Sequence, residues 1–185
     1  HQAALSLQAE NESLQKLLNI KLPPRHRYVT APVIADSGNA FAKSLLVMAG
    51  RDDGVTPGQA VLAGDGLLGR VVESGRKTAR ILLLHDMNSR IPVLVQGTNQ
   101  RAILAGRHDP LPTLLHLPPA LEIKRGARVI TSGHGGLFPY GLPVGEVVAA
   151  PDGPLTVQPY AVTGRVHMVR LVQKVDDENL RHKTR

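Results

Sequence analysis

Two hydrophobic patterns divide the chain. Residues 2 to 22 show the spacing of an α-helix, with apolar side chains three and four residues apart. From residue 28 onward, short runs rich in Val, Ile and Leu are separated by turns that contain Gly, Pro and Asp, as is typical of β-strands. The predicted strands are Arg27–Ala35, Ser44–Ala49, Ala60–Ala63, Leu67–Ser74, Ala79–Leu84, Ile91–Gln96, Arg101–Ala105, Thr113–Leu117, Ala127–Thr131, Val144–Ala149, Leu155–Gln158 and His167–Val172.

The helical segment carries the pattern of a short coiled coil. Its seam has Leu at the d positions and a single Asn at an a position. This combination favours a parallel two-stranded coil, because the buried amide is best satisfied by its mate across the dimer axis. The alternative is an amphipathic helix that packs on its own domain. We predict dimerisation through Leu7, Asn11, Leu14 and Leu18.

Strand spacing predicts two small β domains after the helix. Short strands with a turn roughly every ten residues are typical of barrels and sandwiches. The predicted fold class is therefore mainly β, with an N-terminal coiled-coil helix followed by two small β-barrel domains. Pro23-Pro24 ends the helix, because neither ring nitrogen can donate a hydrogen bond. The predicted boundaries are 1–22 for the helix, 26–88 and 89–173 for the barrels, and 174–185 for a charged tail that we expect to be disordered.

A weak internal repeat supports two related domains. The sequence PGQAVL at 57–62 is echoed by RGARVI at 125–130, and GRVV at 69–72 is echoed by GEVV at 145–148. The two segments are 11 residues apart in the first copy (69 − 58) and 19 in the second (145 − 126). The additional eight residues lie within Thr131–Pro143, so the second domain is predicted to carry a long Gly-rich loop.

Composition and charge narrow the possible partners. The chain has no Cys, which excludes disulfides and Cys-based metal sites. Its formal charge of +7 suits nucleic acid, anionic lipid or an acidic protein. The basic residues form separate groups, however, and only 3% of residues are aromatic, so the stacking platform of a nucleic-acid site is missing and we predict no such partner. No apolar run approaches the roughly 20 residues of a membrane span, so any anchor is expected to precede His1.

One glycine motif resembles a nucleotide site but favours a turn. Residues 64–69 match G-x-G-x-x-G, which binds a dinucleotide only where a helix begins at the motif. The residues that follow, RVVESG, are β-branched and are then interrupted by Gly. We interpret Asp65-Gly66 as a tight hairpin turn that needs a positive φ.

A second motif raises the question of catalysis. The sequence TSGHGG at 131–136 could supply Ser132 as a nucleophile with glycine amides as an oxyanion hole. A nucleophile also needs a base that a third group holds in place, and no G-x-S-x-G elbow is present. The His residues form neither H-x-H nor H-E-x-x-H. We predict no enzyme, cofactor or metal site; the alternative is an extracytoplasmic serine hydrolase on a trypsin-like double barrel.

The Gly-rich loop is also a candidate for protein binding. Phe138-Pro139-Tyr140 places two of the chain's five aromatic residues within three positions. Aromatic side chains in a rigid turn commonly anchor interfaces, and loops on β scaffolds often carry binding. We predict Phe138 and Tyr140 as partner-binding residues. The competing interpretation is that Phe138 fills one end of the barrel while the glycines permit a tight corner.

The same loop resembles the signature of a bacterial family. TSG-x-GG-x-FP-x-GLPVG at 131–145 is similar to the signature of the rod-shape-determining protein MreC family. Three further stretches agree in the order of that family, so the resemblance covers about residues 5 to 173. They are ENESLQKLL at 10–18, DGVTPG at 53–58 with GLLGRVV at 66–72, and LLLHDMNSRIPV at 82–93.

This resemblance implies a location and a set of partners. It implies a periplasmic scaffold, anchored to the inner membrane by a span absent from this sequence, that maintains rod shape within the wall-elongation complex. Implied partners are a second copy in a homodimer able to form filaments, the elongation transpeptidase and the membrane proteins of that complex. An actin-like filament protein is an implied partner through the missing N-terminal region.

Overall fold

The structure, a computed structural model, describes most of the chain. The described residues are 2–17, 27–38, 43–64, 66–107, 111–118, 122–136, 138–148, 154–162, 164 and 166–173. Residues 28–173 form one compact unit, and the N-terminal helix belongs to another. The expected tail of 174–185 lies outside the described residues.

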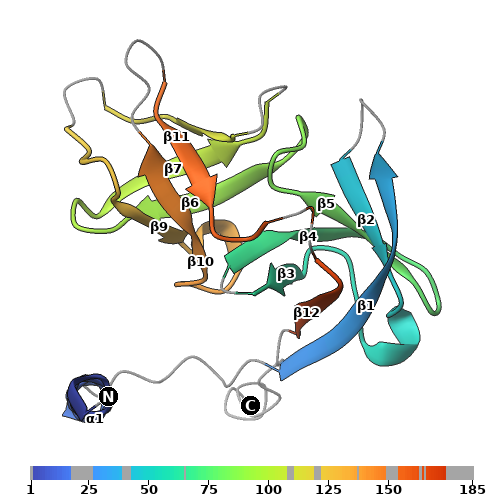
Figure 1. Ribbon diagram of the computed structural model, residues 1–185, viewed down its shortest axis with the longest axis horizontal. Coiled ribbons are helices and arrows are strands. Elements are labelled where there is room, and N and C mark those ends of the chain that lie inside the picture. The colour runs from blue at the N-terminus through green and yellow to red at the C-terminus, as the bar shows by residue number, and fades with distance from the viewer. Residues whose placement is uncertain are drawn as a thin grey trace, which may run out of the picture. The chain divides into compact units, whose positions relative to one another are not determined.

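The larger unit consists of two closed β-barrels, which confirms the predicted fold class (Figure 1). Each predicted strand is present, with ends that differ by a few residues. The first barrel contains β1 (Arg27–Gly38), β2 (Lys43–Val47), β3 (Ala60–Ala63), β4 (Gly66–Ser74), β5 (Ala79–Leu83) and β12 (Met168–Gln173). The second contains β6 (Arg90–Val95), β7 (Gln100–Ala105), β8 (Thr113–Leu115), β9 (Arg128–Thr131), β10 (Pro143–Val148) and β11 (Thr156–Pro159).

The strand order corrects the expectation that residues 89–173 form one barrel. β12 lies in the first barrel between β1 and β3, and β6 lies in the second between β7 and β9. The chain is therefore two six-strand repeats, β1–β6 and β7–β12, and each gives its last strand to the barrel of the other. The spacing of apolar residues locates a strand but does not identify its neighbours, because strand pairing depends on contacts between residues far apart in the chain. The exchange ties the two barrels together.

The internal repeat is exact at the level of backbone hydrogen bonds. The Gly58 N–H donates to the Val71 carbonyl, and the Gly126 N–H donates to the Val147 carbonyl, both at 2.8 Å. The Val71 N–H likewise bonds the Gln59 carbonyl, and the Val147 N–H the Ala127 carbonyl, both at 2.9 Å. The β3–β4 pair is thus the structural equivalent of the β9–β10 pair.

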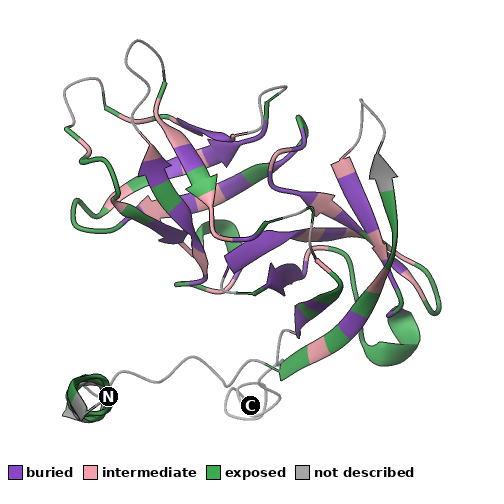
Figure 2. Cartoon of the chain, in the orientation of Figure 1, coloured by how far each residue is buried: buried purple, intermediate pink, exposed green. Residues whose placement is uncertain are grey.

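Strands β3 and β4 contribute side chains to the hydrophobic cores of both barrels. Both faces of β3 are buried, as Figure 2 shows for this short strand. Val61 and Ala63 pack in the core of the first barrel, whereas Ala60 and Leu62 pack with core residues of the second. On β4, Leu68 packs in the core of the first barrel and Leu67 packs with core residues of the second. A strand buried on both faces loses the usual alternation of polar and apolar residues, which explains the run of apolar residues here.

The G-x-G-x-x-G segment is a β-hairpin, as predicted. β3 and β4 pair antiparallel across it, with Ala63 opposite Gly66. The positive φ falls on Gly64, at 57°, rather than on Gly66, and Asp65 lies outside the described residues. Gly66 has a different role, because a Cβ there would lie 2.8 Å from the Cβ of Tyr160.

A buried carboxylate orders the connection between the barrels. Asp86 is 2% exposed and accepts hydrogen bonds from the backbone N–H groups of Lys43 and Asn88, each at 2.8 Å. The Ser89 N–H donates to the Asp86 carbonyl, and Gly106 packs so closely on that carbonyl that a Cβ would overlap it. The LLLHDMNSR segment is therefore a structural turn that fixes where the second repeat begins.

His85, in this turn, is expected to make the stability of the protein depend on pH. Burial lowers the pKa of His85, and the charge of Lys43 lowers it further, against the opposing effect of Asp86 and Asp36. An unfolded His has a pKa of about 6.5, so below that pH the unfolded state binds more protons than the folded state. The free energy of unfolding should fall as the pH drops from about 7 to about 5. His85→Gln should flatten that fall in urea denaturation; parallel curves for the two proteins would contradict the prediction.

The N-terminal helix, α1 (Gln2–Leu17), agrees with the helical prediction over the residues described. Leu7 is 65% exposed, and Leu5 is 63% exposed. The side chains of Asn11 and Leu14, and Leu18 as a whole, lie outside the described residues. Within the described part of the chain, no helix is long and apolar enough to cross a membrane. The predicted dimer seam thus remains a prediction.

Candidate partner-binding surface

The loop between β9 and β10 is held in place by Thr131. This side chain is fully buried; its Oγ1 donates to the Pro139 carbonyl at 2.6 Å and accepts from the Leu142 N–H at 2.9 Å. The Gly141 N–H also donates to the Thr131 carbonyl at 2.9 Å. These bonds join both ends of the loop and fix its base.

The two aromatic residues of the loop lie in different environments. Phe138 is 4% exposed and belongs to the core of the second barrel, as the competing interpretation expected. Its side chain is therefore a stabilising element of the fold and does not face a partner. Tyr140 is 65% exposed, and its backbone packs against Gly133 on the opposite arm of the loop. Of the pair, only Tyr140 is available to a partner.

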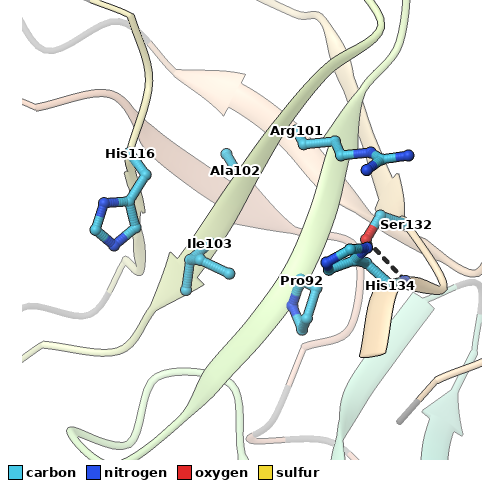
Figure 3. Close-up of a pocket in the computed structure, with 7 residues that line it drawn as sticks. All are labelled: Pro92, Arg101, Ala102, Ile103, His116, Ser132 and His134. Carbon is cyan, nitrogen blue, oxygen red and sulfur yellow. Dashed lines mark hydrogen bonds between the residues drawn. The ribbon is translucent and has the colours of Figure 1, made fainter. Parts of the chain in front are cut away.

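A small pocket lies on the outer surface of the second barrel beside this loop (Figure 3). Its volume is about 200 Å³. Pro92 on β6 and Ile103 on β7 are directly opposite each other in the sheet. The Ser132 N–H donates to the Pro92 carbonyl at 3.1 Å, which fixes the loop against β6. The lining residues are Pro92, Arg101, Ala102, Ile103, His116, Ser132 and His134.

The pocket contains Ser132, whose hydroxyl is bonded to a backbone group in the described part of the chain. The Ser132 Oγ accepts a hydrogen bond from the backbone N–H of His134, at 3.3 Å, so the bond does not involve the imidazole ring. A general base would have to approach the hydroxyl through a ring nitrogen. The carboxylate of Asp86 is occupied by two backbone donors in the turn between the barrels. Among the described residues, no group of three His, Asp or Glu could hold a metal ion.

Of the residues that line this pocket, the sequence motifs had pointed only to Ser132 and His134 in the loop. Pro92 and Ile103 could have been inferred from the alternation of their strands, since the residues beside them are buried. His116 gave no signal, because it follows β8 in a loop and its position depends on how the barrel closes. Its φ of 66° is uncommon for a residue other than Gly.

These features define a class of protein. Two closed barrels are linked by β3 and β4, which contribute to both cores, a fixed loop presents Tyr140, and a pocket of side-chain size lies beside it. The fold is that of a protein built from two closed β-barrels.

Comparison with known proteins identifies the family. The profile of the family described as Rod shape-determining protein MreC, barrel core, matches residues 33–173. The chain is 43% identical over 172 residues to the cell shape-determining protein MreC of Cereibacter sphaeroides, covering 93% of this chain and 57% of that protein. It is 41% identical over 169 residues to that of Caulobacter vibrioides, covering 91% and 49%. The chain belongs to the MreC family, and both of these relatives are named cell shape-determining proteins.

Solved structures agree with this assignment. MreC of Listeria monocytogenes superposes with a TM-score of 0.77 at 29% identity, covering 93% of this chain and 88% of that one. A structure described as the major periplasmic domain of the cell shape-determining filament MreC gives 0.71 at 28% identity, with coverage of 80% and 98%. A complex between penicillin-binding protein PBP2 and MreC of Helicobacter pylori gives 0.59 at 16% identity, covering 81% and 99%, which supports the fold alone. The chain spans about half the length of the curated relatives it matches.

Proposed function

We propose that this chain is the periplasmic part of a non-catalytic scaffold in the cell-wall elongation complex. The observation that carries the proposal is its 43% identity, over almost its whole length, to a cell shape-determining protein. In this role it maintains rod shape by dimerising and by binding peptidoglycan-synthesis proteins. A membrane span outside this sequence anchors it to the inner membrane. The region N-terminal to this sequence contacts the actin-like filament protein. The dimers can assemble further into filaments.

The elongation transpeptidase is the proposed principal partner. The solved Helicobacter pylori complex pairs a distant relative of this chain with a penicillin-binding protein, which supports this choice. The membrane proteins of the complex are the other proposed partners. Tyr140 is the proposed contact residue, because it is a large exposed aromatic side chain on a loop whose ends are fixed.

Replacing Tyr140 by alanine should weaken capture of the transpeptidase without unfolding the protein. Truncating an aromatic residue at the centre of an interface costs about 2 kcal/mol, which corresponds to about a thirtyfold loss of affinity. The measurement is binding of the purified periplasmic transpeptidase domain by surface plasmon resonance, with the melting temperature recorded in parallel. The matched control is Val162→Ala, since Val162 is 63% exposed outside the loop. Equal affinity of Tyr140→Ala and the parent protein would place the interface elsewhere.

Dimerisation through the helix is proposed from the seam of Leu7, Asn11, Leu14 and Leu18. Replacing both Leu7 and Leu14 by alanine keeps a strong helix former and removes the apolar contacts between the two helices. Burial of a Leu contributes about 1.5–3 kcal/mol, so the dimer dissociation constant should rise by more than about tenfold in sedimentation equilibrium. Leu5→Ala is the control, because Leu5 lies off the seam. A mass that stays unchanged in the double variant at every concentration would exclude this helix as the dimer element.

A further inference from the structure

We propose that the pocket beside the β9–β10 loop binds an extended segment of a partner protein in which a branched apolar side chain stands next to a carboxylate. The pocket is lined by Pro92, Arg101, Ala102, Ile103, His116, Ser132 and His134. The inference rests on the proposed function in one respect only: both treat the second barrel as a surface that binds other proteins.

The size of the pocket favours a single side chain over a small molecule. Sites for drug-sized ligands usually enclose about 300 Å³ or more, whereas this pocket has about 200 Å³. Pro92 and Ile103 contribute adjacent apolar surfaces from β6 and β7. Both residues are half-buried without a bound partner. A branched aliphatic side chain would remove the remaining apolar surface from water.

The polar groups of the pocket favour an anion. Arg101 is exposed and takes part in none of the ion pairs of the described residues, which are Arg76–Asp52 and Arg80–Glu73. His116 and His134 add ring nitrogens, and both residues are exposed. None of the described lining residues is acidic. A carboxylate next to the apolar side chain would therefore meet Arg101, whose planar guanidinium suits bidentate pairing.

The architecture favours side-chain recognition in this region. A peptide that adds a strand needs a free sheet edge, and both barrels are closed. The pocket walls are also fixed: Ser132 is bonded to β6 through the Pro92 carbonyl, and the His134 N–H is bonded to Ser132 Oγ. In Figure 3, Ser132 and His134 lie on one side of Pro92, and Ile103 and His116 lie on the other side. Arg101 is on the same strand as Ile103. Little ordering of the protein is needed before a segment binds.

The test uses an array of immobilised octapeptides with every pair of residues at two central positions, flanked by Gly and Ser. The full chain, labelled at its N-terminal amine, is applied to the array. Peptides that combine Leu, Ile or Val with Asp or Glu should bind best. Replacing the acidic residue by Asn or Gln should reduce the retained signal about tenfold.

Variants distinguish the pocket from general attraction to a basic protein. Arg101→Glu should lose about tenfold in signal on the acidic peptides, whereas Arg107→Glu makes the same change of charge at an exposed position outside the pocket and should lose less than about twofold. Ile103→Ala should remove the preference for branched apolar residues. Equal losses in Arg101→Glu and Arg107→Glu, or no preference for acidic peptides, would overturn the proposal. Selective acidic peptides together with failed capture of the transpeptidase would retain the pocket and reject the proposed partner.

Discussion

Gly69→Ala and Gly145→Ala are each expected to destabilise the protein by about 3 kcal/mol or more. The two glycines occupy equivalent positions in the two repeats, on β4 and β10. A Cβ on Gly69 would overlap the Leu82 carbonyl, and a Cβ on Gly145 would overlap the Gln158 carbonyl. The obstructing atoms are backbone atoms of the neighbouring strand, which cannot move aside as a flexible side chain can. The strands would have to separate at a point where they pair.

Thermal unfolding measures this effect. A loss of about 3 kcal/mol should lower the melting temperature by about 10 °C in a chain of this size. Gly164→Ala is the matched control, because nothing lies within 4 Å of a Cβ at Gly164 and its backbone is not left-handed. The control should stay within about 0.5 kcal/mol of the parent protein. If Gly69→Ala melts together with Gly164→Ala, the close approach of β4 to β5 is not needed for stability.

Cutting the chain between the barrels is expected to unfold the first one. A fragment of residues 26–88 contains β1 to β5 but lacks β12, which lies between β1 and β3. It would lose two buried residues of the first barrel's core, Val169 and Leu171. Each contributes about 1.5–3 kcal/mol by burial, so the loss is roughly 3–6 kcal/mol, which reaches the lower end of the total stability of a typical domain. The fragment should show no cooperative thermal transition by circular dichroism.

Complementation provides the control for this experiment. A second fragment, residues 89–173, contains every strand of the second barrel together with β12. Mixing the two fragments in equal amounts should restore a cooperative transition, because β12 can then enter the first barrel. A fragment of residues 26–88 that unfolds cooperatively by itself would show that the exchanged strand is dispensable.

The sequence alone determined the local structure of this protein. Turn residues and apolar runs located the strands, because a strand needs only a suitable pattern over a few positions. The sequence repeat places Gly145 at the position equivalent to Gly69. In each barrel this glycine lies very close to a backbone carbonyl of the neighbouring strand. The loop of Thr131–Pro143 was visible as additional residues in the second repeat, and the family signature lay within it.

Only the tertiary structure decided which strands are neighbours and which side chains face outward. The exchange of β6 and β12 depends on contacts between residues far apart in the chain, so no local pattern encodes it. Phe138 and Tyr140 are two positions apart and are both aromatic, yet one is in the core and the other in solvent. That difference follows from the turn that Thr131 fixes with its buried hydroxyl. The pocket likewise required the closure of the second barrel, which brings Pro92, Ile103 and His116 together from three separate segments.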